Sequence, residues 1–265
     1  MSRNIYLALG DSITAGMDTS HPTLSFVKHV SEFLKSKSIT ERTVVIAQPG
    51  WTAKRLFQMG STLPNTLWDN VGIATICIGS SDFSRLLKPR RLSLDGNPFS
   101  PRAILQKADE FGYHTDQLFQ LVKNKEIPHV LVTTLYNPFP SFMPAGHFIE
   151  GINSIIRDCA SYYKFSVVDV DKRFTNNEAY FIQGYRTGGI EDLMTPLRKP
   201  ILPNNAGHRL IADLITQRLT QLLTKGSNNK HSGSRRQHKA TFKKLNGLRK
   251  GKSTRVRRYV SMKQS

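Results

Sequence analysis

Five apolar runs rich in β-branched residues alternate with stretches of helical periodicity along this chain of 265 residues. The runs cover residues 4–9, 43–48, 72–79, 128–135 and 164–170. Apolar residues recur at helical intervals in the segments 23–37, 101–124, 148–163 and 206–224. Strands that alternate with helices pair in parallel, because each crossover helix returns the chain to the same edge and covers a face of the sheet. The pattern therefore predicts an α/β fold built on one parallel sheet.

The first run ends at the tripeptide Gly10-Asp11-Ser12. Parallel sheets bind ligands at the carboxyl ends of their strands, so Ser12 stands where a nucleophile would be placed. Gly, Asp and Ser also favour ordinary turns, each for its own conformational reason. On this segment alone, a catalytic serine and a plain turn are both open.

Residues 7–16, Leu-Ala-Leu-Gly-Asp-Ser-Ile-Thr-Ala-Gly, resemble the first signature block of the GDSL or SGNH hydrolases, which are esterases, lipases and related acyl hydrolases. Residues 44–52 resemble the second block, in which Gly50 takes the place of a glycine whose backbone N–H faces the reacting oxyanion. Residues 76–82 resemble the third block, Gly-x-Asn-Asp, but Ser81 stands where the Asn would donate to the oxyanion.

This resemblance implies a three-layer α/β/α sandwich around a five-stranded parallel sheet, the flavodoxin-like fold of SGNH hydrolases. It implies Ser12 as the nucleophile of ester hydrolysis. The oxyanion hole would be formed by Ser12, Gly50 and Ser81, with a shorter donor at the third position.

Residues 202–208, Leu-Pro-Asn-Asn-Ala-Gly-His, resemble the closing block of the family, Asp-x-x-His-Pro-Asn followed by Gly-His and a helix. Aligned on Pro-Asn and Gly-His, the catalytic His falls on Leu202 and the Asp falls on Lys199. A serine hydroxyl needs an adjacent base that a third group orients, so this register predicts impaired catalysis. A second register aligns residues 205–208 with Asp-x-x-His and makes His208 the base. In the first register, His208 caps or packs the start of the last helix.

Two irregular stretches, residues 89–101 and 136–146, follow the third and fourth predicted strands. Loops at these strand ends are expected to wall the pocket. The second stretch and the helix after it supply an aromatic and thioether cluster of Phe139, Phe142, Met143 and Phe148. This cluster is either an apolar wall for an acyl group or a packed lid.

The composition changes after residue 224. Residues 225–265 contain 14 Lys or Arg and no Asp or Glu, so this segment carries +14 of the net charge of +19 of the whole chain. Large apolar residues are too sparse there to form a core, so we predict one domain over residues 1–224 and a basic, disordered tail over residues 225–265. Such a tail favours polyanions such as nucleic acid, an anionic membrane surface or a wall polymer, without sequence preference. A purely solubilising extension is the alternative. If the tail does not bind, the anion site is expected near the pocket, at Arg85, Lys88, Arg90 and Arg91.

Three further features limit the functional classes. The first residues run directly into the first strand without the apolar region of a secretory signal, and no segment has the length of a membrane span. Only two cysteines occur, which gives no disulfide framework, so we expect a cytoplasmic protein without an integral membrane segment. The eight His show no metal-ligand spacing with Cys or carboxylates, so we expect neither a metal nor a cofactor.

Two functions are consistent with these patterns. The first is a serine hydrolase of small acyl esters, in which Ser12 attacks the carbonyl and loss of the Asp/His pair impairs turnover. The second is a non-catalytic binding or anchoring module that keeps the fold and pocket and is tethered by its basic tail. The Gly-Asp-Ser segment and Gly50 favour the first, whereas Lys199, Leu202 and Ser81 favour the second.

Overall fold

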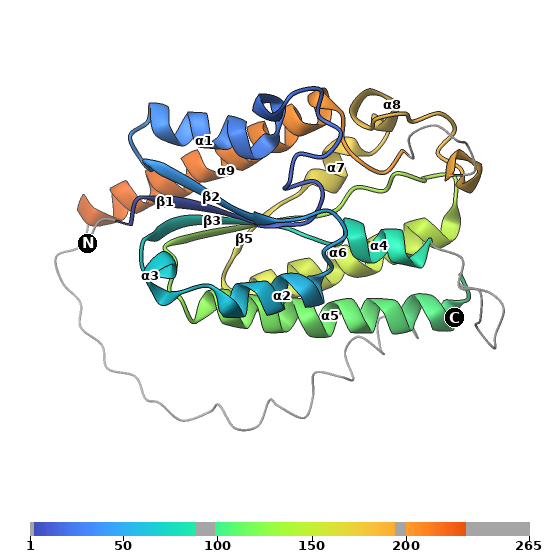
Figure 1. Cartoon of the computed structure of the whole chain (residues 1–265), viewed down its shortest axis with the longest axis horizontal. Coiled ribbons are helices and arrows are strands. Elements are labelled where there is room, and N and C mark those ends of the chain that lie inside the picture. The colour runs from blue at the N-terminus through green and yellow to red at the C-terminus, as the bar shows by residue number, and fades with distance from the viewer. Residues whose placement is uncertain (1–2, 88–98, 194–199, 232–265) are drawn as a thin grey trace, which may run out of the picture. The chain divides into compact units, whose positions relative to one another are not determined.

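The computed structural model describes residues 3–87, 99–193 and 200–231 (Figure 1). Its centre is a five-stranded sheet in the order β2-β1-β3-β4-β5, with every neighbouring pair parallel. The strands are β1 (Ile5–Gly10), β2 (Arg42–Ala47), β3 (Val71–Cys77), β4 (His129–Thr133) and β5 (Ser166–Val168). Each predicted strand contains or overlaps an observed one, and the predicted three-layer α/β fold is confirmed.

Helices cover both faces of the sheet (Figure 1). On one face lie α1 (Phe26–Ser36) and the part of α9 (Asn205–His231) that follows the closing loop. On the other lie α2 (Ala53–Thr62), α5 (Pro101–Lys123) and α6 (Met143–Tyr163), where α5 packs against both of its neighbours. Shorter elements complete the described chain: α3 (Asn65–Trp68), α4 (Ser80–Leu86), α7 (Val170–Phe174), α8 (Glu178–Phe181) and the 3₁₀ turns η1 (Pro22–Leu24) and η2 (Ile190–Leu193).

Three predicted boundaries differ from the structure. Helix α6 begins at Met143, inside the predicted loop 136–146, because a proline in the first helical turn lacks only an N–H that the helix does not use. Strand β5 is shorter than predicted, since Lys164 ends α6 in a left-handed conformation and α7 begins at Val170. Helix α9 continues through residues 225–231, because an established helix extends at low cost.

The contacts along the chain define two units, Met1–Leu223 and Thr224–Ser265. The predicted tail thus begins inside α9 rather than after it. The remainder of that tail, residues 232–265, lies outside the described residues. The separation of a folded domain from a basic tail at residue 224 stays a prediction.

The core encloses the two central strands, β1 and β3, whose residues are all buried. At the end of β1, Gly10 allows a close approach that no other residue would permit. A Cβ at this position would overlap the side chain of Thr14 and the carbonyl group of Cys77. Glycine here therefore lets the turn after β1 lie directly against the end of β3, where the candidate site forms.

Candidate active site

The candidate site lies at the edge of the sheet where β1, β2 and β3 end. Gly10, the last residue of β1, pairs with Ala47 of β2 on one side and Cys77 of β3 on the other. Residues just beyond three adjacent strand ends are therefore neighbours in space. The structure accordingly gathers at one edge the turns that contain Ser12 and Gly50 and the first turn of α4, which contains Ser81.

Asp11 organises this edge and is completely buried. Its Oδ1 accepts from the backbone N–H of Ile13 at 3.1 Å, while its Oδ2 accepts from the backbone N–H groups of Ser80 at 3.0 Å and Ser81 at 3.4 Å. The Ser80 hydroxyl also donates to Oδ2, at 2.7 Å. Burial raises the pKa of the Asp11 carboxyl, and these four bonds oppose the rise. Asp11 thus fixes the turn after β1 to the start of α4.

Ser12 has an 8% exposed fraction and one side-chain hydrogen bond within the described ranges. Its Oγ lies 3.3 Å from the Oγ of Ser80. Since the Ser80 hydroxyl proton is directed to Asp11, Ser12 is the donor of this pair. The hydroxyl of Ser12 therefore points its proton into a chain that runs through Ser80 to Asp11, and not toward an imidazole.

The backbone N–H groups of Ser12 and Gly50 are without an acceptor in the part of the chain that the structure describes. Gly50 has a φ of 85°, in the left-handed region that glycine adopts most easily, and a Cβ built on it would meet nothing within 4 Å. Conformation rather than crowding thus explains glycine at this position. Ser81 is 6% exposed, and its hydroxyl makes no hydrogen bond to another described residue.

The closing segment places an apolar side chain at the position that the first register aligns with the family base. Leu202 is buried, with an exposed fraction of 9%, and its carbonyl accepts from the backbone N–H of Gln183 at 2.9 Å. The next residue, Pro203, forms an antiparallel bridge with Ile182. Asn204 then caps α9, since its Oδ1 accepts from the N–H of Gly207 at 2.9 Å. Lys199 lies outside the described residues.

His208 is completely buried in the first turns of α9. Its Nδ1 accepts from the backbone N–H of Phe26 at 3.3 Å, and its ring stacks on the Phe26 ring with centroids 6.2 Å apart. An accepting Nδ1 leaves the ring proton on Nε2. Burial lowers the pKa of His208 to about 4, an effect that the Met17 backbone opposes. His208 thus satisfies a free N–H at the start of α1, whereas the sequence predicts a role at the start of its own helix.

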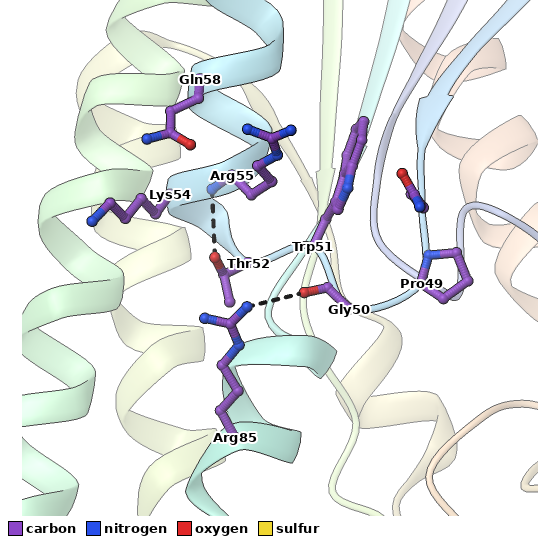
Figure 2. Close-up of a pocket in the computed structure, with 9 residues that line it drawn as sticks. Pro49, Gly50, Trp51, Thr52, Lys54, Arg55, Gln58 and Arg85 are labelled. Carbon is purple, nitrogen blue, oxygen red and sulfur yellow. Dashed lines mark hydrogen bonds between the residues drawn. The ribbon is translucent and has the colours of Figure 1, made fainter.

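A polar pocket of about 400 Å³ opens beside Gly50 (Figure 2). The turn after β2 and the first turns of α2 form most of it, and α4 contributes one side chain. Figure 2 shows Arg85 reaching from α4 to the carbonyl group of Gly50, to which its Nη2 donates at 3.4 Å. The lining residues are Gln48, Pro49, Gly50, Trp51, Thr52, Lys54, Arg55, Gln58 and Arg85.

The predicted aromatic cluster is divided between core and surface. Phe139 and Phe148 are fully buried and both pack against Phe83, with ring centroids 6.0 and 6.1 Å away. Phe142 makes an edge contact with Phe99, while Met143 is 70% exposed. The two buried rings are part of the domain core, so at most the other two face a ligand.

The sequence matches the model of the GDSL-like lipase/acylhydrolase family over residues 8–210. The chain belongs to this family. The match covers the strand ends that carry Ser12, Gly50 and Ser81, and it extends past the closing segment into α9. No curated protein sequence matches the chain.

Solved structures of a lipase and of acetyl xylan esterases share the fold. A lipase from a goat rumen metagenome superposes with a TM-score of 0.66 and 18% identity, over 81% of this chain and 96% of that one. The acetyl xylan esterase AlAXEase gives 0.55 and 20% identity, over 80% and 98%. The acetylxylan esterase Axe2 of Geobacillus stearothermophilus gives 0.57 and 15% identity, over 82% and 94%. At these identities the likeness shows the fold alone.

Within the GDSL pattern, sequence reasoning misses two parts of the site. Ser80 occupies the unspecified position of the third block, so nothing marks it until the fold brings it to Asp11. Two of the three pocket cations, Lys54 and Arg55, come from α2, a helix of only ten residues that the sequence analysis does not predict. Its start is signalled only by Thr52, whose side chain accepts from the backbone N–H of Arg55.

The described residues contain no group of three or more His, Cys, Asp or Glu arranged to hold a metal ion. None of the helices in the described ranges is long and apolar enough to cross a membrane.

Proposed function

We propose that the chain is a serine hydrolase of carboxylic esters that keeps the backbone donors of the oxyanion site and whose proton transfer is impaired. The observation that carries the proposal is that the Ser12 hydroxyl lies at the same edge of the sheet as the backbone N–H groups of Ser12 and Gly50, which have no acceptor among the described residues. Donors held by the backbone stabilise the developing oxyanion without reorganising during the reaction. The Ser81 hydroxyl is a third donor, shorter than the Asn of the family.

In the proposed reaction, Ser12 Oγ attacks the ester carbonyl and forms a tetrahedral oxyanion. The hydroxyl proton must leave Oγ, and the departing alcohol must gain a proton. An imidazole normally performs both transfers. Here the aligned position holds the apolar Leu202, and the only described acceptor for the Ser12 proton is Ser80. The proposed chemistry draws on the chain's own groups and needs no cofactor.

Asp11 is a poor substitute for the missing base. Its carboxylate already accepts four hydrogen bonds, which hold the turn after β1 against α4. A proton taken from Ser12 through Ser80 would break this arrangement. Turnover should therefore be limited to attack by the Ser12 hydroxyl without a base, which the oxyanion donors and substrate binding accelerate on the order of 10³-fold over water.

Hydrolysis of short-chain aryl esters tests this proposal. The full chain should hydrolyse them weakly, and Ser12→Ala should reduce the rate to that of buffer. Ser61→Ala, which removes an exposed hydroxyl on α2, is the matched control and should leave the rate unchanged. Equal rates for the wild type and Ser12→Ala would refute the hydrolase and favour a binding module.

A non-catalytic anchoring role is the second candidate, and the buried Leu202 at the base position favours it. In this role the basic segment 225–265 tethers the domain to a polyanion through its 14 cationic residues. Retention on heparin and on RNA should then fall steeply with salt, with log–log slopes of about −0.7 to −0.9 per neutralised phosphate.

Two truncations locate the tether, one after Thr224 and one after His231, where α9 ends. Both should abolish retention at moderate salt while leaving the melting temperature unchanged. Retention that survives truncation would assign anion binding to the domain itself. Of the basic residues expected near the pocket, Arg85 is in the described chain, whereas Lys88, Arg90 and Arg91 lie outside it.

A further inference from the structure

The pocket beside Gly50 is lined by three cationic side chains and by no carboxylate (Figure 2). Lys54 and Arg55 project from the first turn of α2, and Arg85 projects from the last turn of α4. The pocket holds about 400 Å³, which accommodates an oxyanion group together with part of the molecule that carries it. Its electrostatic character is therefore positive and local.

These three cations are not used in ion pairs within the described ranges. Other basic side chains do form ion pairs. Arg157, for example, contacts Asp169 at 2.8 Å and Asp171 at 2.7 Å. Arg85, in contrast, has the carbonyl of Gly50 as its hydrogen-bond partner, at a long 3.4 Å. Guanidinium groups present paired donors that match carboxylate and phosphate oxygens. Arg55 and Arg85 thus retain donors for a ligand.

Two acidic groups interact with the pocket cations: Glu110 interacts with Lys54 but forms its ion pair with Lys107, and Asp82 interacts with Arg85. Asp82 is covered by the start of α2, and its Oδ2 accepts from the backbone N–H of Ala53 at 3.1 Å. Burial raises the pKa of the Asp82 carboxyl to about 7, so a large part of its negative charge is absent at neutral pH. The positive field of Lys54, Arg55 and Arg85 is therefore left for an external anion.

We propose that this pocket is an anion subsite that binds a phosphate or carboxylate group of the ester substrate. Gly50 connects the two sites, since its N–H is a proposed oxyanion donor and its carbonyl contacts Arg85. A substrate whose carbonyl lies at the N–H of Gly50 places a charged substituent a few bonds away, among the three cations. The substrate class is then an ester with an anionic group near the scissile carbonyl. This class rests on the proposed hydrolase function, whereas anion binding does not.

Binding can be measured without turnover, because Trp51 lines the pocket and the other tryptophan, Trp68, is buried in the core. The full chain is titrated separately with inorganic phosphate and with succinate, and tryptophan emission is recorded. We expect a saturable change with at least one anion, lost in Trp51→Phe. The double variant Arg55→Gln/Arg85→Gln should weaken binding by about tenfold or more.

The matched control is Arg42→Gln, which removes the same charge from an exposed position at the start of β2. It should leave the titration unchanged, because it leaves the pocket cations intact. An emission change that is absent with both anions, or equal in the wild type and the double variant, would overturn the subsite. Saturation by phosphate alone or by succinate alone would identify the group that the subsite prefers.

A pair of aryl esters links the subsite to hydrolysis. The mono-4-nitrophenyl ester of adipic acid and the 4-nitrophenyl ester of hexanoic acid differ mainly in a terminal carboxylate, which is too far from the ester carbonyl to attack it readily. We expect a higher kcat/KM for the adipate ester, with the preference lost in Arg55→Gln/Arg85→Gln through KM. Equal kcat/KM for the two esters in the wild type would overturn the substrate class. If neither ester is hydrolysed, the hydrolase function is refuted, while the emission titration still decides whether the subsite binds an anion.

Discussion

Two regions of the family pattern differ in how the fold uses them. At the ends of β1 and β3, the pattern residues also hold the structure together: Gly10 allows the close approach of two strands, and Asp11 accepts four hydrogen bonds. In the closing segment, Asn204 caps α9 and His208 satisfies an N–H of α1, whereas Leu202 is buried at the position that the first register aligns with the base.

The comparison shows which part of a catalytic motif the fold needs. In both regions, the motif residues that make a structural contact are the family's own residues. A general base, in contrast, is needed for chemistry rather than for packing, and an apolar side chain such as that of Leu202 is easily buried. We therefore expect the glycines and capping residues of a GDSL motif to persist even where the proton-transfer groups differ. The following experiments test this division.

The largest effect should come from restoring the proton-transfer pair. The double variant Lys199→Asp/Leu202→His should raise hydrolysis of short-chain aryl esters on the order of 10²-fold or more, which is the usual contribution of a positioned general base. Initial rates of 4-nitrophenyl ester hydrolysis measure the gain.

The control for this gain is the triple variant that also carries Ser12→Ala, which should lose the activity completely. A double variant that folds to the same melting temperature and gains no activity would show that the closing segment is aligned in the wrong register.

A smaller effect concerns the pH dependence of stability and His208. Its pKa is about 4 in the folded chain, below the ordinary value of 6.5, so folding favours the neutral ring. Its stabilising contribution is complete above pH 6.5 and is lost as the pH falls toward 4. Between neutral pH and about pH 4.5, the loss should be on the order of 2 kcal/mol.

The matched variant is His208→Asn, whose side-chain oxygen can still accept from the N–H of Phe26 but does not titrate. Urea unfolding at both pH values should show a smaller loss of stability in His208→Asn than in the wild type. Hydrolysis at neutral pH should be unchanged in the variant. Loss of hydrolysis at full stability would instead make His208 the base, as the second register of the closing segment proposes.

The smallest effect should come from Ser80, which joins Ser12 to Asp11. Ser80→Ala removes two buried side-chain hydrogen bonds but keeps the backbone N–H that donates to Asp11. It should therefore cost roughly 1 to 2 kcal/mol of stability. Hydrolysis should change by less than about tenfold, since Ser80 positions the Ser12 hydroxyl and does not act as the base.

Ser84→Ala is the control for Ser80→Ala, because its hydroxyl makes a local bond to the Ser80 carbonyl in the same helix. Chemical unfolding and ester hydrolysis should both be close to those of the wild type. If Ser80→Ala abolished hydrolysis as completely as Ser12→Ala does, the Ser80–Asp11 chain would be the proton route.

The fold could be predicted because its signals are local. Apolar runs and helical periodicity locate the five strands and the long helices, and strand ends locate Ser12 and Gly50. The roles of Ser80 and His208 could not be predicted, because Ser80 meets Asp11 from 69 residues away and His208 meets Phe26 from 182. The short helices α4 and α7 bury only a few apolar side chains each, so their periodicity is too weak to locate them.

The most direct test is the pH profile of the hydrolysis that depends on Ser12, taken as the rate of the wild type minus that of Ser12→Ala. Without an imidazole base, the logarithm of kcat/KM should rise steadily from about pH 5 to about pH 9, as an increasing fraction of the hydroxyl is deprotonated. His208→Asn should give the same profile. A profile that is already level across this range, or that levels off above an apparent pKa between about 4 and 6.5, and that becomes a steady rise in His208→Asn, would contradict the claim that the proton-transfer half of the site is absent.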